Sequence, residues 1–126
     1  MRRSISIETA DIGTTVVVVR ISGALDSTNA NDTAEALLSH VPHAASARLV
    51  ADLSGITYVD SAGVRAFVEL SDRLRRNRQA LALVAPAESR ISCVLSIVKM
   101  ELLVPVYQTV EAAVDAAASP AAEDGS

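Results

Sequence analysis

The residues of this chain best suited to chemistry are Asp60, Ser61, Ala62 and Gly63, which stand between an apolar stretch, residues 48–59, and a stretch with helical periodicity. A serine in the first turn of a helix carries its hydroxyl where backbone N–H groups point outward, a position that suits an anionic group. Serine is also common there for purely structural reasons, as an N-cap or first-turn residue. Ser61 is therefore the candidate functional residue, and Asp60 is the N-cap, an acidic neighbour of the hydroxyl, or both.

A role for Ser61 as the nucleophile of an enzyme would require a general base within hydrogen-bond reach and a third group that orients the base. The sequence has no G-x-S-x-G elbow. Its two histidines, His40 and His43, flank Pro42 at the end of a predicted helix, where we expect surface residues. A glycine-rich phosphate loop is also absent from the sequence. We therefore expect a binding protein that uses no cofactor, rather than an enzyme.

The single cysteine, Cys93, can form neither an internal disulfide nor a zinc site with other cysteines, so we expect no metal centre. Its place in an apolar helix predicts a buried or half-buried side chain. The N-terminus begins with two arginines but lacks the apolar core of a signal peptide, and no apolar run reaches the length of a membrane span. These features predict a cytoplasmic protein without a membrane partner.

Length and composition predict one domain, residues 1–118, followed by a flexible tail over residues 119–126. Of the 126 residues, 50% are hydrophobic and 21% are charged, enough for a proper core and a charged surface. The formal net charge of −4 argues against a nucleic-acid partner, because neutralising phosphates requires a basic face. The three aromatic residues, Tyr58, Phe67 and Tyr107, are too few for a base-stacking platform.

Hydrophobic periodicity predicts strands that alternate with helices after an N-terminal hairpin with a turn near residues 11–13. The predicted strands are 4–9, 14–22, 49–53, 80–84 and 104–107, and the predicted helices are 30–41, 61–77, 91–98 and 110–117. Strand 14–22 has a nearly continuous apolar run and should be central, and a turn should separate strand 49–53 from a short apolar run that leads to Asp60. The fold class is therefore α/β, a mixed sheet of four to five strands with helices packed mainly on one face.

Polar residues on tight turns follow two of these strands, at residues 23–26 and 60–63. Binding sites in α/β folds lie at the carboxyl ends of strands. If the two strands are parallel neighbours, both turns face the same way. Asp26, in the first turn, either caps the helix that follows or contacts a partner.

Two segments resemble the STAS domain, and particularly the bacterial anti-sigma factor antagonists. Residues 52–64, DLSGITYVDSAGV, are similar to the family's Asp-Leu-Ser followed by Asp-Ser-Ser/Thr/Ala-Gly-Leu/Val at a helix start. Residues 23–26, Gly-Ala-Leu-Asp, resemble the family's Gly-Glu-Leu-Asp. The order of the elements matches over roughly residues 4–118, so the resemblance implies a single-domain STAS-like fold.

The resemblance implies that Ser61 is phosphorylated by a partner that is both a GHKL-type serine kinase and an anti-sigma factor. The unphosphorylated protein would bind that partner and release a sigma factor, phosphorylation would weaken the complex, and a PP2C-type phosphatase would reset the cycle. The alternative implied by the same resemblance is a STAS regulatory or scaffold module of another system, such as a stressosome component or a lipid-transport subunit.

Carried over by motif position, the partner-binding residues are expected to be Asp26, Asp60, Ser61, Ala62, Gly63 and Arg65. Ala62 stands where many members have a second hydroxyl, so Ser61 is the unambiguous acceptor in the motif. Gly63 allows close approach. Arg65 replaces a common glycine and, four residues after Ser61, shares a helical face with it, where it can pair with a phosphoserine. Ala24 replaces the family's usual acidic residue.

Overall fold

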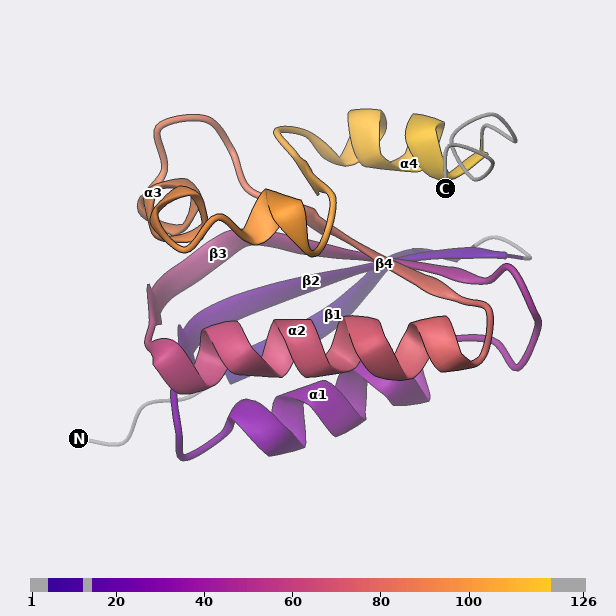
Figure 1. Ribbon diagram of the computed structural model, residues 1–126, viewed down its shortest axis with the longest axis horizontal. Coiled ribbons are helices and arrows are strands. Elements are labelled where there is room, and N and C mark those ends of the chain that lie inside the picture. Colours follow the sequence, from indigo (N-terminus) through magenta and orange to yellow (C-terminus); the bar gives the residue numbers. More distant parts are fainter. Residues whose placement is uncertain (1–4, 13–14, 119–126) are drawn as a thin grey trace.

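Five strands form one sheet in the order β1-β2-β3-β4-β5 (Figure 1). The computed structural model describes residues 5–12 and 15–118. The elements are β1 Ile5–Ile12, β2 Val16–Leu25, α1 Ala30–Ser39, β3 Arg48–Val59, α2 Ser61–Arg76, β4 Ala80–Val84, α3 Arg90–Ile97, the 3₁₀ helix η1 Met100–Leu102, β5 Val106–Tyr107 and α4 Val110–Ala118. β1 is antiparallel to β2, and every other pair is parallel. The predicted α/β fold with a mixed sheet is confirmed.

The position of β2 follows from its run of valines. Val17, Val18 and Val19 are each at most 1% exposed, and successive side chains enter cores on opposite faces of the sheet. A strand covered on both faces loses the polar alternation of a half-wet strand, which is why this run predicts a central strand correctly. β1 pairs with β2 as the predicted hairpin, and residues 13–14 of its connection lie outside the described residues, as does the predicted tail, residues 119–126.

The predicted turn within residues 48–59 is wrong, because β3 is one strand of 12 residues. The pairing of β2 with β3 shifts register between Asp52 and Gly55, so the chain forms an irregularity in the ladder instead of reversing. A Cβ at Gly55 would lie 2.4 Å from Ser22 Oγ, so glycine lets the two strands stay close at this point. β3 pairs with β4 only as far as Asp52, and the remainder of β3 extends past β4.

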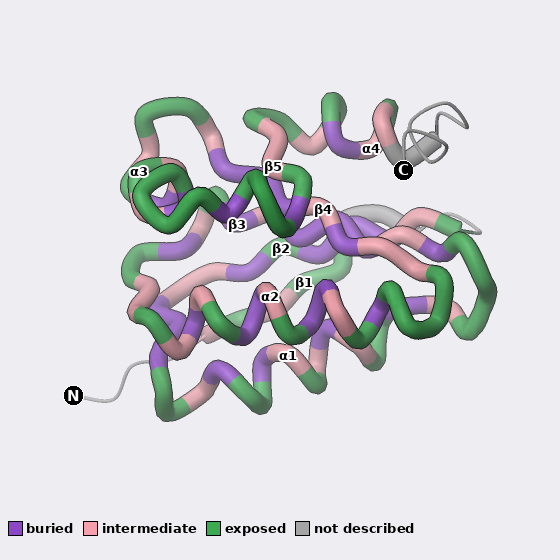
Figure 2. The backbone as a smooth tube through the Cα atoms, in the orientation of Figure 1, coloured by how far each residue is buried: buried purple, intermediate pink, exposed green. Residues whose placement is uncertain are grey.

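The two longest helices, α1 and α2, cover one face of the sheet, and α3 and α4 lie over the other (Figure 1). The main core includes Leu25, Leu53 and Phe67, all about 1% exposed or less, and a smaller core centres on Val18, Val50 and Ala113. Burial is nearly continuous over the first halves of β2 and β3, and it follows one side of α2 (Figure 2). We expected the helices mainly on one face of the sheet. The two longest helices, α1 and α2, do lie on one face, and the shorter α3 and α4 cover the other.

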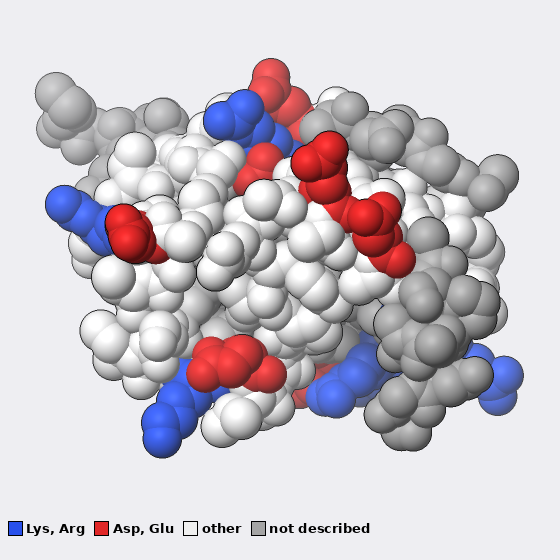
Figure 3. Space-filling view, turned by 90° about the horizontal axis from the view of Figure 1, so that it is seen from above, with Lys and Arg blue, Asp and Glu red and all other residues white. Residues whose placement is uncertain are grey.

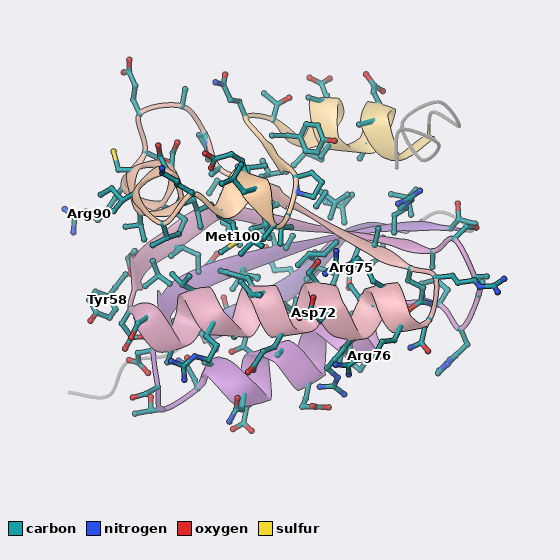
Figure 4. All side chains as sticks on the ribbon, in the orientation of Figure 1. Tyr58, Asp72, Arg75, Arg76, Arg90 and Met100 are labelled. Atoms are coloured by element: carbon teal, nitrogen blue, oxygen red, sulfur yellow. The ribbon has the colours of Figure 1, made fainter. Side chains whose placement is uncertain are left out.

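Most of the residues that we predicted to lie on the surface are exposed in the structure. His40 and His43 are exposed as predicted, and the arginine-rich end of α2 is solvated, with an ion pair between Arg75 and Asp72 (Figure 4). Cys93 is exposed, so the prediction of a buried or half-buried thiol is wrong. The eight-residue α3 buries Ile91 and Leu95, and Cys93 lies off that stripe. Within the described ranges, no helix combines the length and apolar character needed to cross a membrane.

Thr33 on α1 places a hydroxyl in the buried interface between α1 and α2, and substitutions there test whether this hydroxyl lowers the stability of the fold. It is 2% exposed, and its hydroxyl has no hydrogen-bond partner within the described part of the chain. A buried unsatisfied hydroxyl costs about 1–3 kcal/mol, so we expect the isosteric Thr33→Val to raise the free energy of unfolding by roughly 1 kcal/mol in urea denaturation. Thr33→Ser, which keeps the hydroxyl and loses a methyl group, should lower it. Equal or lower stability of Thr33→Val would contradict this account.

Candidate functional site

The carboxyl ends of β2 and β3 lie side by side, because the parallel register pairs Leu25 with Val59. The next residue, Asp60, donates its backbone N–H to the Leu25 carbonyl at 3.3 Å. The turns after the two strands therefore emerge at the same edge of the sheet. The two strands are parallel neighbours, which is the condition under which both turns were expected to face the same way. This edge carries the start of α2 and the turn before α1 (Figure 1).

Asp60 is the N-cap of α2. Its backbone is extended, and its Oδ1 accepts hydrogen bonds from the N–H groups of Ala62 at 3.0 Å and Gly63 at 3.1 Å. Its carbonyl accepts from the Val64 N–H at 3.0 Å, the first bond of the helix. Because Asp60 makes these capping bonds, the exposed Ser61 is the first helical residue and not the cap. Of the two structural alternatives for Ser61, the N-cap is therefore excluded and the first-turn residue is the one that the structure shows.

Gly63 sets the distance between α2 and the sheet. A Cβ at this position would lie 2.6 Å from Val59 Cγ2 and 3.0 Å from both the Cγ and the carbonyl oxygen of Leu25. The first turn of the helix therefore sits directly on the paired ends of β2 and β3. This contact gives the physical reason for the close approach predicted at Gly63.

Asp26 organises the turn before α1. Its Oδ1 accepts from the N–H and the hydroxyl of Thr28, and its carbonyl accepts from Ala30 N–H at 2.8 Å. Asn29 is the N-cap residue of α1, and its side chain bridges Asp26 N–H and the Ala24 carbonyl. Asp26 is only 6% exposed. Of its two predicted roles, it supports the start of α1 through this turn without being the cap residue itself, and its contact with a partner stays a prediction.

The six predicted partner-binding residues fall into three groups by exposure. Ser61 and Arg65 are exposed, Asp60 and Ala62 are half-buried, and Asp26 and Gly63 are buried. Arg65 lies one helical turn after Ser61, on the same side of α2. The accessible part of this edge is thus built from Ser61, Arg65 and their half-buried neighbours, the buried pair lie beneath it, and its contact with a partner stays a prediction.

The structure has a hollow near Ser61 that the sequence did not predict. It has a volume of about 240 Å³ and is lined by Ile56, Thr57, Tyr58, Val59, Arg90, Ile91 and Val94. Tyr58 and Arg90 lie at the same end of the molecule (Figure 4). The hollow forms because α3 packs against the part of β3 that extends past β4. The only signal in the sequence was that Tyr58 is one of three aromatic residues, and the contact of β3 with α3 joins segments distant in sequence.

The geometry offers Ser61 no histidine base. α1 begins at the turn of Asp26, beside the site, and runs 10 residues away from it, about 15 Å at 1.5 Å per residue. His40 and His43 follow its far end, where the His40 Nδ1 lies 2.8 Å from the Ala36 carbonyl oxygen. The neighbouring carboxylate, Asp60, is engaged with two backbone N–H groups. The arrangement exposes a hydroxyl, and within residues 5–12 and 15–118 no histidine stands beside it as a general base.

Residues 6–113 match the STAS domain family, and the chain belongs to that family. Its fold is similar to an anti-sigma factor antagonist from Mycobacterium paratuberculosis, with 22% identity over 92% of this chain and 96% of that chain and a TM-score of 0.74. It is also similar to the Bacillus cell fate determinant SpoIIAA in its phosphorylated form, with 17% identity, coverage of 87% and 97%, and a TM-score of 0.56. A third likeness, at 18% identity and a TM-score of 0.70, covers 92% of this chain and 22% of the murine Solute Carrier 26 family member A9 anion transporter. At these identities the structural likeness shows a shared fold.

Gly63→Ala tests whether the start of α2 depends on its contact with the strand ends. We expect it to lower the free energy of unfolding by about 1–3 kcal/mol through overpacking, although alanine is normally favoured over glycine in a helix by about 1 kcal/mol. Val59→Ala removes the nearest clashing atom, so the loss should be smaller in that background. Denaturation of the wild type, both single variants and the double variant gives the coupling energy. A stabilising Gly63→Ala, or zero coupling, would refute the proposed contact.

Proposed function

We propose that this protein is an anti-sigma factor antagonist that binds an anti-sigma factor kinase and is switched off by phosphorylation of Ser61. The observation that carries the proposal is the exposed hydroxyl of Ser61 in the first turn of α2, beside an N-cap carboxylate that already occupies the helix N-terminus. The hydroxyl is accessible to a kinase and is not needed for capping. Membership of the STAS family, and neighbours described as anti-sigma factor antagonists, support the same role.

The physical basis of the switch is the charge that phosphorylation adds. A phosphoserine carries about −1.5 to −2 at pH 7, and here it would join the Asp60 carboxylate in one helical turn. The Ala62 and Gly63 N–H groups already donate to Asp60, so they cannot neutralise the new charge without releasing the cap. The phosphate would therefore stay directed outward, where it opposes a packed interface through repulsion and the cost of desolvation.

The fold should survive the modification. Ser61 is exposed, so the phosphate needs no room in the core, and the positive end of α2 contributes about 0.3–1 kcal/mol toward an anion in its first turn. Phosphorylation should accordingly change binding more than folding. The proposed partners are a GHKL-type serine kinase and a PP2C-type phosphatase, in the cytoplasm.

Binding measurements with the cognate kinase test the proposal. Protein with phosphoserine encoded at position 61 should bind at least roughly tenfold more weakly than the unmodified protein, which corresponds to about 1.4 kcal/mol. Ser61→Ala should bind like the unmodified protein and take up no phosphate from ATP, whereas Ser96→Ala, at an exposed serine on α3, should still be phosphorylated. Equal binding of the modified and unmodified proteins would refute the switch and would favour a STAS module of another system.

Arg65 should pair with the phosphate, because it is the cation one turn after Ser61 on the same side of α2. A nearby guanidinium favours the dianion and so lowers the pKa of the second ionisation of the phosphate. Arg65→Gln should raise that pKa by an amount that corresponds to about 0.2–1 kcal/mol, the range for exposed ion pairs. Phosphorus NMR titration of the two phosphoproteins measures the change. Arg76→Gln, at the other end of α2, is the control, and an equal effect of both variants would exclude a specific pair.

A further inference from the structure

The exposed apolar side chains of this molecule are concentrated in one segment. Among the described residues, five large apolar side chains are exposed, and four of them lie at the ends of α3 and η1 or directly after them: Ile97 79%, Val98 43%, Leu102 76% and Leu103 56%. We call these four residues the α3–η1 patch. Figure 3, which looks from above onto the side of the sheet that carries α3, η1 and α4, shows broad uncharged areas between separate charged groups. Contiguous exposed apolar side chains of this kind mark interaction surfaces.

The patch is held firmly by its backbone. Lys99 turns the chain between α3 and η1 with a left-handed φ of 56°. The N–H groups of Leu102, Leu103 and Val104 donate to carbonyls of the same segment at 2.8–3.1 Å. Met100 and Val104, which are at most 1% exposed, anchor the segment in the core. The exposed side chains are therefore fixed in place, which lowers the conformational entropy lost on binding.

Two charges of opposite sign lie within this segment. Lys99 and Glu101 are both exposed, and neither makes an ion pair within residues 5–12 and 15–118. The segment thus combines four apolar side chains with one cation and one anion that are unpaired among the described residues, and its net charge is zero. A surface of this composition is complementary to a second copy of itself.

We propose that the α3–η1 patch is a two-fold self-association surface. In a two-fold interface the same patch is used on both chains, so if Lys99 faces Glu101 of the other chain, Glu101 faces Lys99 in return. The apolar side chains then pack against their equivalents, and both charges are paired. An anionic membrane would favour a cluster of cations, and a strongly charged partner would favour a patch of one sign. The observed balance favours a second copy.

The proposal goes beyond the anti-sigma role and does not depend on it. α2 and the α3–η1 patch lie on opposite sides of the sheet (Figure 1), so a dimer formed through the patch leaves the start of α2 open. Four apolar side chains give a small interface, and interfaces at the low end of the size range are weak and transient. The dimer should accordingly dissociate in the micromolar range or above.

Sedimentation of the full chain from low micromolar to millimolar concentration tests the proposal. A reductant excludes disulfides through the exposed Cys93. We expect the wild type to show reversible, concentration-dependent dimerisation and Ile97→Asp to remain monomeric. Ala45→Asp, which adds the same charge at an exposed site near the far end of α1, should dimerise like the wild type. A wild type that is monomeric throughout would overturn the proposal.

Charge reversal separates a two-fold dimer from any other association. Lys99→Glu and Glu101→Lys should each weaken dimerisation by roughly tenfold, because each places like charges opposite one another twice. The double variant, and an equimolar mixture of the two single variants, should restore it, since every pair is again of opposite sign. Circular dichroism confirms that each variant is folded. Failure of both the double variant and the mixture to recover would overturn the two-fold arrangement.

Discussion

The parallel pairing of β2 with β3 is the constraint on which the rest of the site depends. It brings Leu25 opposite Val59, and because both strands then end at one edge, the helices that follow them start side by side. The missing side chain of Gly63 lets the first turn of α2 rest on this pair of strand ends. A side chain there would push the helix away from the strands and move Ser61 with it. The position of an exposed hydroxyl is thus fixed by buried contacts beneath it.

Two carboxylates at this edge are occupied by backbone donors of their own turns. Asp60 takes the N–H groups of Ala62 and Gly63, and Asp26 takes that of Thr28. The capping bonds of Asp60 contribute about 0.5–2 kcal/mol, and the turn of Asp26 is held by its own bonds to Thr28, so neither turn depends on the Ser61 hydroxyl. The bonds to Asp60 use two of the backbone donors that would otherwise bind a phosphate at the start of α2. Under the proposed switch, structural stability and sensitivity to added charge therefore have one cause: the helix terminus already holds an anion.

Local patterns predicted most of the fold, because they depend on neighbours in sequence. The valines of β2, the stripe from Val64 to Leu74 and the apolar strand β4 each carry their own periodicity. Long-range contacts produced the errors. Gly55 has turn chemistry locally, yet it serves the close approach of β2. The exposure of Cys93 depends on which side of α3 meets β3. Of the site, the motif predicted Ser61 and its neighbours, whereas the hollow lined by Tyr58 and Arg90 required the docking of α3.

The two surfaces of the molecule differ in how they can respond to phosphorylation. The surface around Ser61 is polar, with Asp60 and Arg65 beside the hydroxyl, so an added phosphate changes its charge directly. The α3–η1 patch is apolar, has its own balanced charges and lies across the sheet from α2. Salt at physiological concentration screens exposed charges beyond about 8 Å, and the sheet with its core separates the two surfaces. Self-association would then display two Ser61 sites at once and would raise the effective concentration for a bivalent partner, while the charge of each site still controls its own contact.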